Sequence, residues 1–339
     1  MSILNWLRRL EAGAHPHDEE EIAGLTERVL GLSPRLRLVP RYEQRLGPAI
    51  GMALDYVRDL VAGLPAPREA SVAAWGSDPY IHAFFGTAHD VELAFSRSSD
   101  LREFFEASVG ADEAYAVLGM TMTERRTLGM ALEGDVMRAE VPQTTVSFSD
   151  HEVRICGSTD ATLREEIARR MLDQMALQSL ANIAADTSRR DMLEREHGLL
   201  KARLRLLERQ STGMRSVMGG DEQADTGERA RLREQIEQNG RELGELGDKS
   251  GALERQLEGM VAVFKDARSC FSIESRRRRL SLMNVILPEG STVPGHELEL
   301  LTARVPGDPP LVRTFALVRF ARAAMLSCTS LLDEAERML

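Results

Sequence analysis

Residues 232–264, LREQIEQNGRELGELGDKSGALERQLEGMVAVF, decide how this chain is built. Large apolar side chains recur there in alternating steps of four and three residues, which places them along one seam of an α-helix. Eight of the ten seam positions are apolar, so this helix is expected to pack lengthwise against another helix. At ~1.5 Å per residue, a helix over this stretch would be roughly 50 Å long. The seam positions are Leu232, Ile236, Asn239, Leu243, Leu246, Ser250, Leu253, Leu257, Met260 and Phe264.

The partner helix is expected in the same chain. Residues 210–227 hold four glycines among polar residues, a composition typical of the tip of a hairpin. If the register is carried back, Asp186 and Arg190 fall on core positions, which predicts a stutter or a local opening near residues 184–192. We therefore predict a long antiparallel coiled-coil hairpin over residues 161–270. The positions of the first arm that repeat the four-three spacing are Leu193, His197, Leu200, Leu204 and Leu207.

Four glycines, Gly240, Gly244, Gly247 and Gly251, lie on one stripe of the second arm. Each glycine inside a helix costs about 1 kcal/mol relative to alanine. Two interpretations stay open: another helix or a second copy approaches closely along this stripe, or the stripe is a loose, tolerant surface.

Composition excludes several classes of protein. A net charge of −10 argues against general affinity for nucleic acid or anionic membranes, and no stretch approaches the ~20 apolar residues that would span a bilayer. Cys156, Cys270 and Cys328 are widely spaced, which indicates reduced thiols in a cytoplasmic protein. Residues 1–10 form a short amphipathic helix in this interpretation, and we expect it to pack on its own domain rather than on a membrane.

Residues 1–140 are predicted to form an N-terminal helical domain. Prolines bound residues 41–64, and Asp78, Thr87 and Ser98 are placed to cap later helices. Residues 111–118 and 123–140 are expected to complete the helices. Half of the ten phenylalanines fall within 22 residues, which predicts an aromatic centre of this domain and leaves open a ligand pocket lined by them. These five are Phe84, Phe85, Phe95, Phe104 and Phe105.

The periodicity changes to two after Pro142, which indicates strands. Residues 143–157 are predicted to form a β-hairpin that turns at Ser149, Asp150 and His151, and residues 278–287, 297–305 and 313–320 are strand-like. Because a lone hairpin is marginal, we predict that all five strands share one sheet. The predicted fold is thus α+β and mostly α: residues 141–160 and 271–339 form a small antiparallel sheet domain with a C-terminal helix at 327–339, and the hairpin at 161–270 interrupts it.

Candidates for chemistry are few. His15, His17 and Asp18 have no spacing typical of a metal site, whereas Asp78 and His82 share a helix face, and His89 with Asp90 could join them around a divalent metal. Nucleophile and phosphate-binding motifs are missing. We assign no catalytic, cofactor-binding or metal-binding residue and expect no cofactor.

Arg276, Arg277, Arg278 and Arg279 form the strongest local charge feature. Pairing with the abundant acidic residues is the simpler interpretation, and binding to a polyanion is the alternative. The run has no interleaved aromatic residues, which argues against single-stranded nucleic acid as that polyanion.

Together these patterns predict a non-enzymatic cytoplasmic scaffold, adaptor or regulatory protein. It would act through coiled-coil-mediated protein–protein interaction, with another protein or with itself as a homo-oligomer. Two alternatives stay open: a polyanion- or nucleic-acid-binding regulator using the four arginines, and a metal-dependent enzyme in the helical domain.

Overall fold

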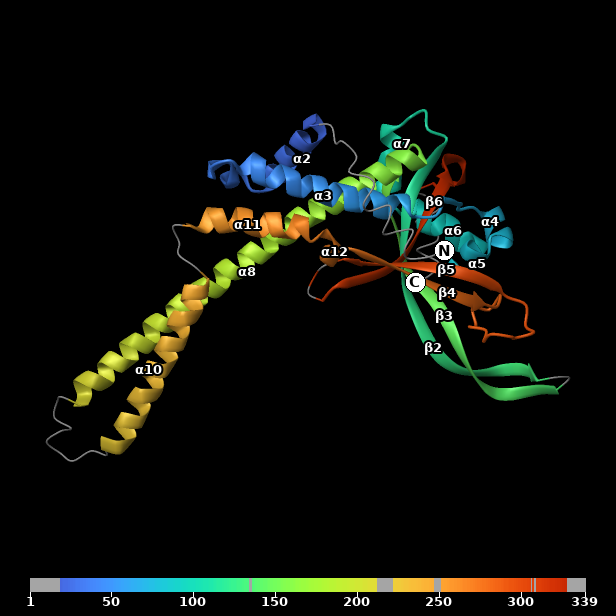
Figure 1. Ribbon diagram of the computed structural model, residues 1–339. Coiled ribbons are helices and arrows are strands. Elements are labelled where there is room, and N and C mark those ends of the chain that lie inside the picture. The colour runs from blue at the N-terminus through green and yellow to red at the C-terminus, as the bar shows by residue number, and fades with distance from the viewer. Residues whose placement is uncertain are drawn as a thin grey trace. The chain divides into compact units, whose positions relative to one another are not determined.

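The computed structural model describes residues 19–133, 136–211, 222–246, 251–305, 307 and 309–327. It combines helices with one antiparallel sheet, which confirms the expected mixture of helix and antiparallel strands (Figure 1). Contacts divide the chain into two compact units, Met1–Met52 with Gln174–Lys265, and Ala53–Asp173 with Asp266–Leu339. The three-domain division stays a prediction.

Unit 1 is helical. Its helix α2 (Glu19–Leu32) begins with three glutamates, which suit the positive end of the helix dipole. After it come the short helix η1 (Pro34–Leu38) and the first part of α3 (Tyr42–Ala62). The later elements are the second part of α8 (Asp160–Ser211), α10 (Glu222–Glu245) and α11 (Ala252–Lys265).

The α-helix predicted over residues 232–264 is not continuous, because Leu246 and Gly251 lie outside the two helices that the structure describes there. Helix α10 ends at Glu245 and α11 begins at Ala252, while residues 247–250 lie outside the described residues. The glycines of the stripe give the reason, because each one weakens the helix locally. The N-terminal amphipathic segment, residues 212–221 of the expected tip and residues 328–339 of the expected C-terminal helix also lie outside the described residues.

Unit 2 packs four short helices against a sheet. The expected capping residues are confirmed: Asp78 accepts a hydrogen bond from the Tyr80 amide at 2.8 Å, Thr87 forms a capping box with Asp90, and Ser98 accepts from the Leu101 amide. The helices are α4 (Val72–Ser77), α5 (Pro79–Phe84), α6 (Ala88–Ser96) and α7 (Ser99–Ala107), and the short α12 (Ala267–Cys270) precedes the later strands.

One six-stranded sheet joins strands from both sides of α8. Its order is β3-β2-β6-β5-β4, with β1 (Arg68–Glu69) pairing parallel to β6. Residues 113–120 of β2 pair antiparallel with residues 314–321 of β6, which confirms that strands before and after the helical insertion share a sheet. The other strands are β2 (Glu113–Glu133), β3 (Val136–Gly157), β4 (Ser272–Leu280), β5 (His296–Val305) and β6 (Leu311–Ala321).

The helices expected at residues 111–118 and 123–140 are wrong, because this region is strand β2 and the start of β3. Alternate residues of β2 are fully buried, namely Ala114, Ala116, Leu118 and Met120. Alanine, leucine and methionine favour helices in isolation, and here pairing with β3 and β6 overrides that preference. Beyond Met120, β2 pairs with β3 alone, and the two strands continue as a ribbon (Figure 1).

The turn predicted at Ser149, Asp150 and His151 is also wrong, since β3 runs straight through these residues. Gly119 pairs with Glu152 and Thr121 with Ser149, so the strand carries an extra residue there, and Asp150 takes a positive φ of 51°. Turn-forming residues have made a β-bulge instead of a hairpin. The bulge shifts the alternation, so that Val146 and Val153 both face the core.

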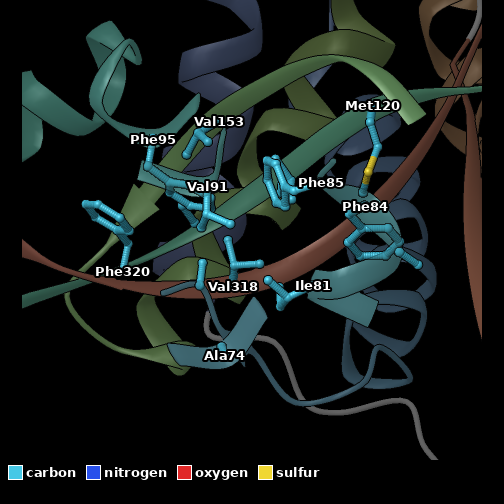
Figure 2. Close-up of a cluster of buried hydrophobic side chains, with 14 of the residues drawn as sticks. Ala74, Ile81, Phe84, Phe85, Val91, Phe95, Met120, Val153, Val318 and Phe320 are labelled. Atoms are coloured by element: carbon cyan, nitrogen blue, oxygen red, sulfur yellow. The ribbon is translucent and has the colours of Figure 1, made fainter. Parts of the chain in front are cut away.

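The phenylalanines form the centre of unit 2, as expected. Phe84, Phe85, Phe95 and Phe105 are buried, and the Phe95 ring stacks on Phe320 of β6 with centroids 4.8 Å apart (Figure 2). They pack against the buried face of β2 and β6. This aromatic cluster therefore fills the interface between the short helices and the sheet.

Candidate functional site

Three ion pairs join α8 to α10. Arg203 lies 2.6 Å from Glu228, Arg233 lies 2.9 Å from Glu208, and Arg189 lies 3.4 Å from Glu242. Arg189 pairs near the C-terminal end of α10, whereas Arg203 and Glu208, farther along α8, pair in its N-terminal half, so the two helices run antiparallel, as Figure 1 also shows. All three pairs are exposed to water, and each is worth at most about 1 kcal/mol.

Burial along α8 and α10 follows the four-three spacing. Leu193 and Leu232 are 7% and 4% exposed. The remaining seam positions of the two helices are half-buried, apart from Asn239, which is buried. The seam thus receives apolar side chains from both helices, while most positions around it stay in water.

One layer of this seam is polar. Asn239 is 9% exposed, and its amide nitrogen has no hydrogen-bond partner in the described structure. Nδ1 of His197 is likewise buried and unpaired. A Cβ built on Gly240 would lie 3.8 Å from Cε1 of His197, so the α10 backbone faces this ring. A buried polar layer weakens a helical pair but disfavours other registers, because a shifted register would place these groups against leucine.

The glycine stripe is not required by contacts within the chain. A Cβ at Gly240 would make ordinary contact, one at Gly244 would meet no described atom within 4 Å, and one at Gly251 would press only on the flexible end of Arg255. Gly247 lies outside the described residues. The described part of the stripe favours the loose-surface interpretation within one chain.

A cavity of about 400 Å³ lies where α8 meets the end of α10 and the start of α11. It coincides with residues 184–192, where the register predicted a local opening. The Arg190 side chain is 13% exposed and lies 3.7 Å from Glu194, while its Nε makes no hydrogen bond in the described structure. The cavity mixes both signs of charge, so it selects no single class of ligand. Its lining residues are Ile183, Asp186, Thr187, Arg190, Asp191, Glu245, Leu246, Ala252, Arg255 and Gln256.

A second cavity, of about 280 Å³, lies in unit 2 and includes Asp78 and His82. Asp78 caps α5 and pairs with Arg68 at 2.9 Å. The two ring nitrogens of His82 each lie 3.2 Å from a backbone carbonyl oxygen, those of Trp75 and Leu282. Both candidate ligands therefore already have structural partners, and no phenylalanine lines this cavity.

His89 and Asp90 do not complete a metal site with them. Asp90 accepts a hydrogen bond from the Thr87 amide, and His89 lies 3.5 Å from Glu92. In the described part of the chain, no three histidine, cysteine, aspartate or glutamate side chains are grouped to hold a metal ion. His15, His17 and Asp18 lie outside it.

His151 is a half-buried titratable residue that lies in the turn predicted from the sequence. Its Nε2 donates to the Phe84 carbonyl at 2.8 Å, and its ring stacks on Phe85. Burial lowers the pKa of His151 below 6.5, so the neutral form suits the folded state. The bulge in β3 turns this side chain toward Phe84 and Phe85, and no pattern in the neighbouring sequence predicts that orientation.

The cysteines have little thiolate character. Burial raises the pKa of Cys156 to about 12 and also raises the pKa of Cys270. A thiol that stays protonated is a poor nucleophile. Cys328 lies outside the described residues.

The arginine run lies on β4, at an edge of the sheet. Arg276 pairs with Glu274 at 3.0 Å, Arg278 lies 3.6 Å from Glu124, and Arg279 donates to two carbonyl oxygens of the following loop. Arg277 lies opposite Glu299 of β5. This geometry favours pairing within the protein, and charges along an edge strand also oppose pairing with other sheets.

Comparison with known proteins adds no relative: no protein-family model, no curated protein and no solved structure matches the chain. In the described residues, no helix combines the length and the apolar character needed to cross a membrane.

Proposed function

We propose that this protein is a non-enzymatic cytoplasmic scaffold, adaptor or regulatory component that acts through a coiled-coil hairpin built from α8 and α10. The observation that carries the proposal is the antiparallel α8–α10 pair, with a seam buried at four-three spacing and three ion pairs across it. Such a pair is a stiff arm that presents side chains to a partner at regular intervals.

The polar layer supports the same proposal. A hairpin that only had to be stable would be better served by leucine at His197 and Asn239, since both carry buried nitrogen atoms without hydrogen-bond partners in the described structure. Retaining them gives up stability for a defined register. A defined register matters when the outer surface of the arm must match a partner.

Affinity capture from the native cell tests the proposal. The full chain is compared with a variant in which residues 194–242 are replaced by a short Gly/Ser linker, which retains α11 and its contacts with η1. A partner that is recovered with the full chain and lost with the linker variant supports the proposal. Recovery of the same partners with both forms would overturn it.

A point variant avoids the need for a large deletion. Leu193→Asp together with Leu243→Asp disrupts the seam, while Gln235→Asp adds a charge at an exposed position of α10. Capture should fail with the double variant and persist with the control. Circular dichroism should show that both retain the sheet.

A further inference from the structure

Three large apolar side chains on α8 are exposed to water at seven-residue intervals. Met192, Leu199 and Leu206 are 64%, 72% and 59% exposed. A spacing of seven residues is two helical turns, so they form one stripe, here called the outer stripe. It runs beside the seam, one residue before Leu193, Leu200 and Leu207, on an arm whose surface is otherwise mostly charged. This regular spacing distinguishes the three side chains from the scattered exposed apolar residues that are common on protein surfaces.

The outer stripe is complementary to itself. If a second α8 is laid antiparallel with a two-fold axis at Leu199, Leu199 meets its own copy and Met192 meets Leu206 of the second copy. A two-fold axis produces both Met192–Leu206 contacts at once, which is the property of an isologous interface.

The charges beside the stripe favour the antiparallel arrangement. Glu196 and Arg203 flank it on the same side, and the two-fold axis places Glu196 of one copy within about 1.5 Å, along the helix, of the level of Arg203 in the other copy, which allows the two side chains to pair. Arg203 already pairs with Glu228, but a guanidinium has five N–H donors and can bridge two carboxylates. A parallel arrangement would instead oppose Glu196 to Glu196 and Arg203 to Arg203, which is repulsive.

We propose that the outer stripe of Met192, Leu199 and Leu206 is a self-association surface, on which a second copy of this chain packs its α8 antiparallel. The inference rests on the proposed function, because it uses the same helical arm. Three side chains from each copy form an interface smaller than the ~1,200 Å² of stable complexes, so the dimer is weak and depends on concentration.

Disulfide trapping tests the geometry in the full chain with Cys156, Cys270 and Cys328 replaced by serine. Leu199→Cys should give a disulfide-linked dimer by itself, because the axis passes beside this residue. Met192→Cys should not, since its own copy lies ~21 Å away at ~1.5 Å per residue, whereas a disulfide needs Cα atoms within about 7 Å. A mixture of Met192→Cys and Leu206→Cys chains should link efficiently.

Other trapping patterns overturn the proposal. Equal self-linkage by all three single-cysteine chains would mean a parallel arrangement. No linkage by Leu199→Cys, together with a monomeric full chain in sedimentation at every concentration, would leave the stripe to another partner.

Sedimentation gives an independent measurement. Leu199→Glu should raise the dimer dissociation constant at least tenfold, whereas Lys201→Glu, on the same helix but off the stripe, should change it less than twofold. An equal effect of the two substitutions would contradict the proposal. The two proposals can fail independently. If Leu199→Glu is monomeric and still captures a partner that the linker variant loses, the proposed function stands without the dimer. If the full chain dimerises through the stripe but the linker variant captures the same partners, the dimer stands and the proposed function fails.

Discussion

The sheet of unit 2 and the α8–α10 pair of unit 1 use burial very differently. Ala116, Leu118 and Phe95 are completely buried in the sheet unit, because helices and strands surround them. Of the described seam positions of α8 and α10, Leu193, Leu232 and Asn239 are less than 10% exposed. Two helices alone cannot enclose their seam. Hydrophobic burial thus stabilises the sheet unit strongly, whereas the helical pair has less buried apolar surface to stabilise it.

The largest effect should come from emptying the sheet core. Phe95→Ala removes a fully buried ring that stacks on Phe320, and we expect a loss of about 3–5 kcal/mol in the free energy of unfolding. Urea denaturation measures it. Val109→Ala, at a position that is 83% exposed, is the matched control and should change little. A loss below about 1 kcal/mol for Phe95→Ala would mean that burial of this ring contributes little to the stability of the sheet unit.

Charging the seam should have a smaller and local effect. Leu193→Asp with Leu243→Asp should open the α8–α10 pair at a cost of about 2–3 kcal/mol, because two carboxylates replace apolar contacts across the seam. Amide exchange should accelerate in α10 and stay slow in β2 and β6. Accelerated exchange in the strands as well would mean that the sheet and the helical pair unfold as one cooperative unit.

Replacing the polar layer should act in the opposite direction. His197→Leu with Asn239→Leu removes two unpaired buried nitrogen atoms, so the pair should gain about 1–2 kcal/mol. Slower amide exchange in α10 is the readout. His197→Leu alone is an informative control, since it leaves Asn239 facing leucine and should gain less. Destabilisation by the double substitution would indicate hydrogen bonds that these groups make with water.

The smallest effect concerns acid. The pKa of His151 is lowered in the folded state, so the unfolded chain binds a proton more readily. The contribution of neutral His151 to the free energy of unfolding should therefore be fully present above pH 6.5, and it should be lost as the pH falls from there through the lowered pKa. His151→Gln should flatten this part of the pH profile of the melting temperature. An identical slope in the wild type and His151→Gln would assign the acid sensitivity elsewhere.

Local chemistry was readable without a structure where neighbours in the chain decide the outcome. Asp78, Thr87 and Ser98 cap helices because each side chain bonds an amide two or three residues ahead. The strands at 297–305 and 313–320 were recognisable from composition and the turns around them. Charged residues on core positions predict a stutter or a local opening near residues 184–192; α8 is continuous there, and a cavity lies beside it.

Distant partners decided the rest. The buried face of β2 carries alanine, leucine and methionine, which favour helices, and it forms a strand because β3 and a segment nearly 200 residues later supply pairing. Ser149, Asp150 and His151 have the composition of a turn, yet the pairing of β3 with β2 makes them a bulge that brings His151 against Phe84 and Phe85. The sequence leaves open a metal site at Asp78 and His82, and only the structure shows that amide, guanidinium and carbonyl groups already occupy both side chains. Helix caps and apolar spacing act over a few residues and can be read along the chain. Strand pairing and the burial of a polar group depend on contacts between residues far apart in the chain, and only the folded structure brings those residues together.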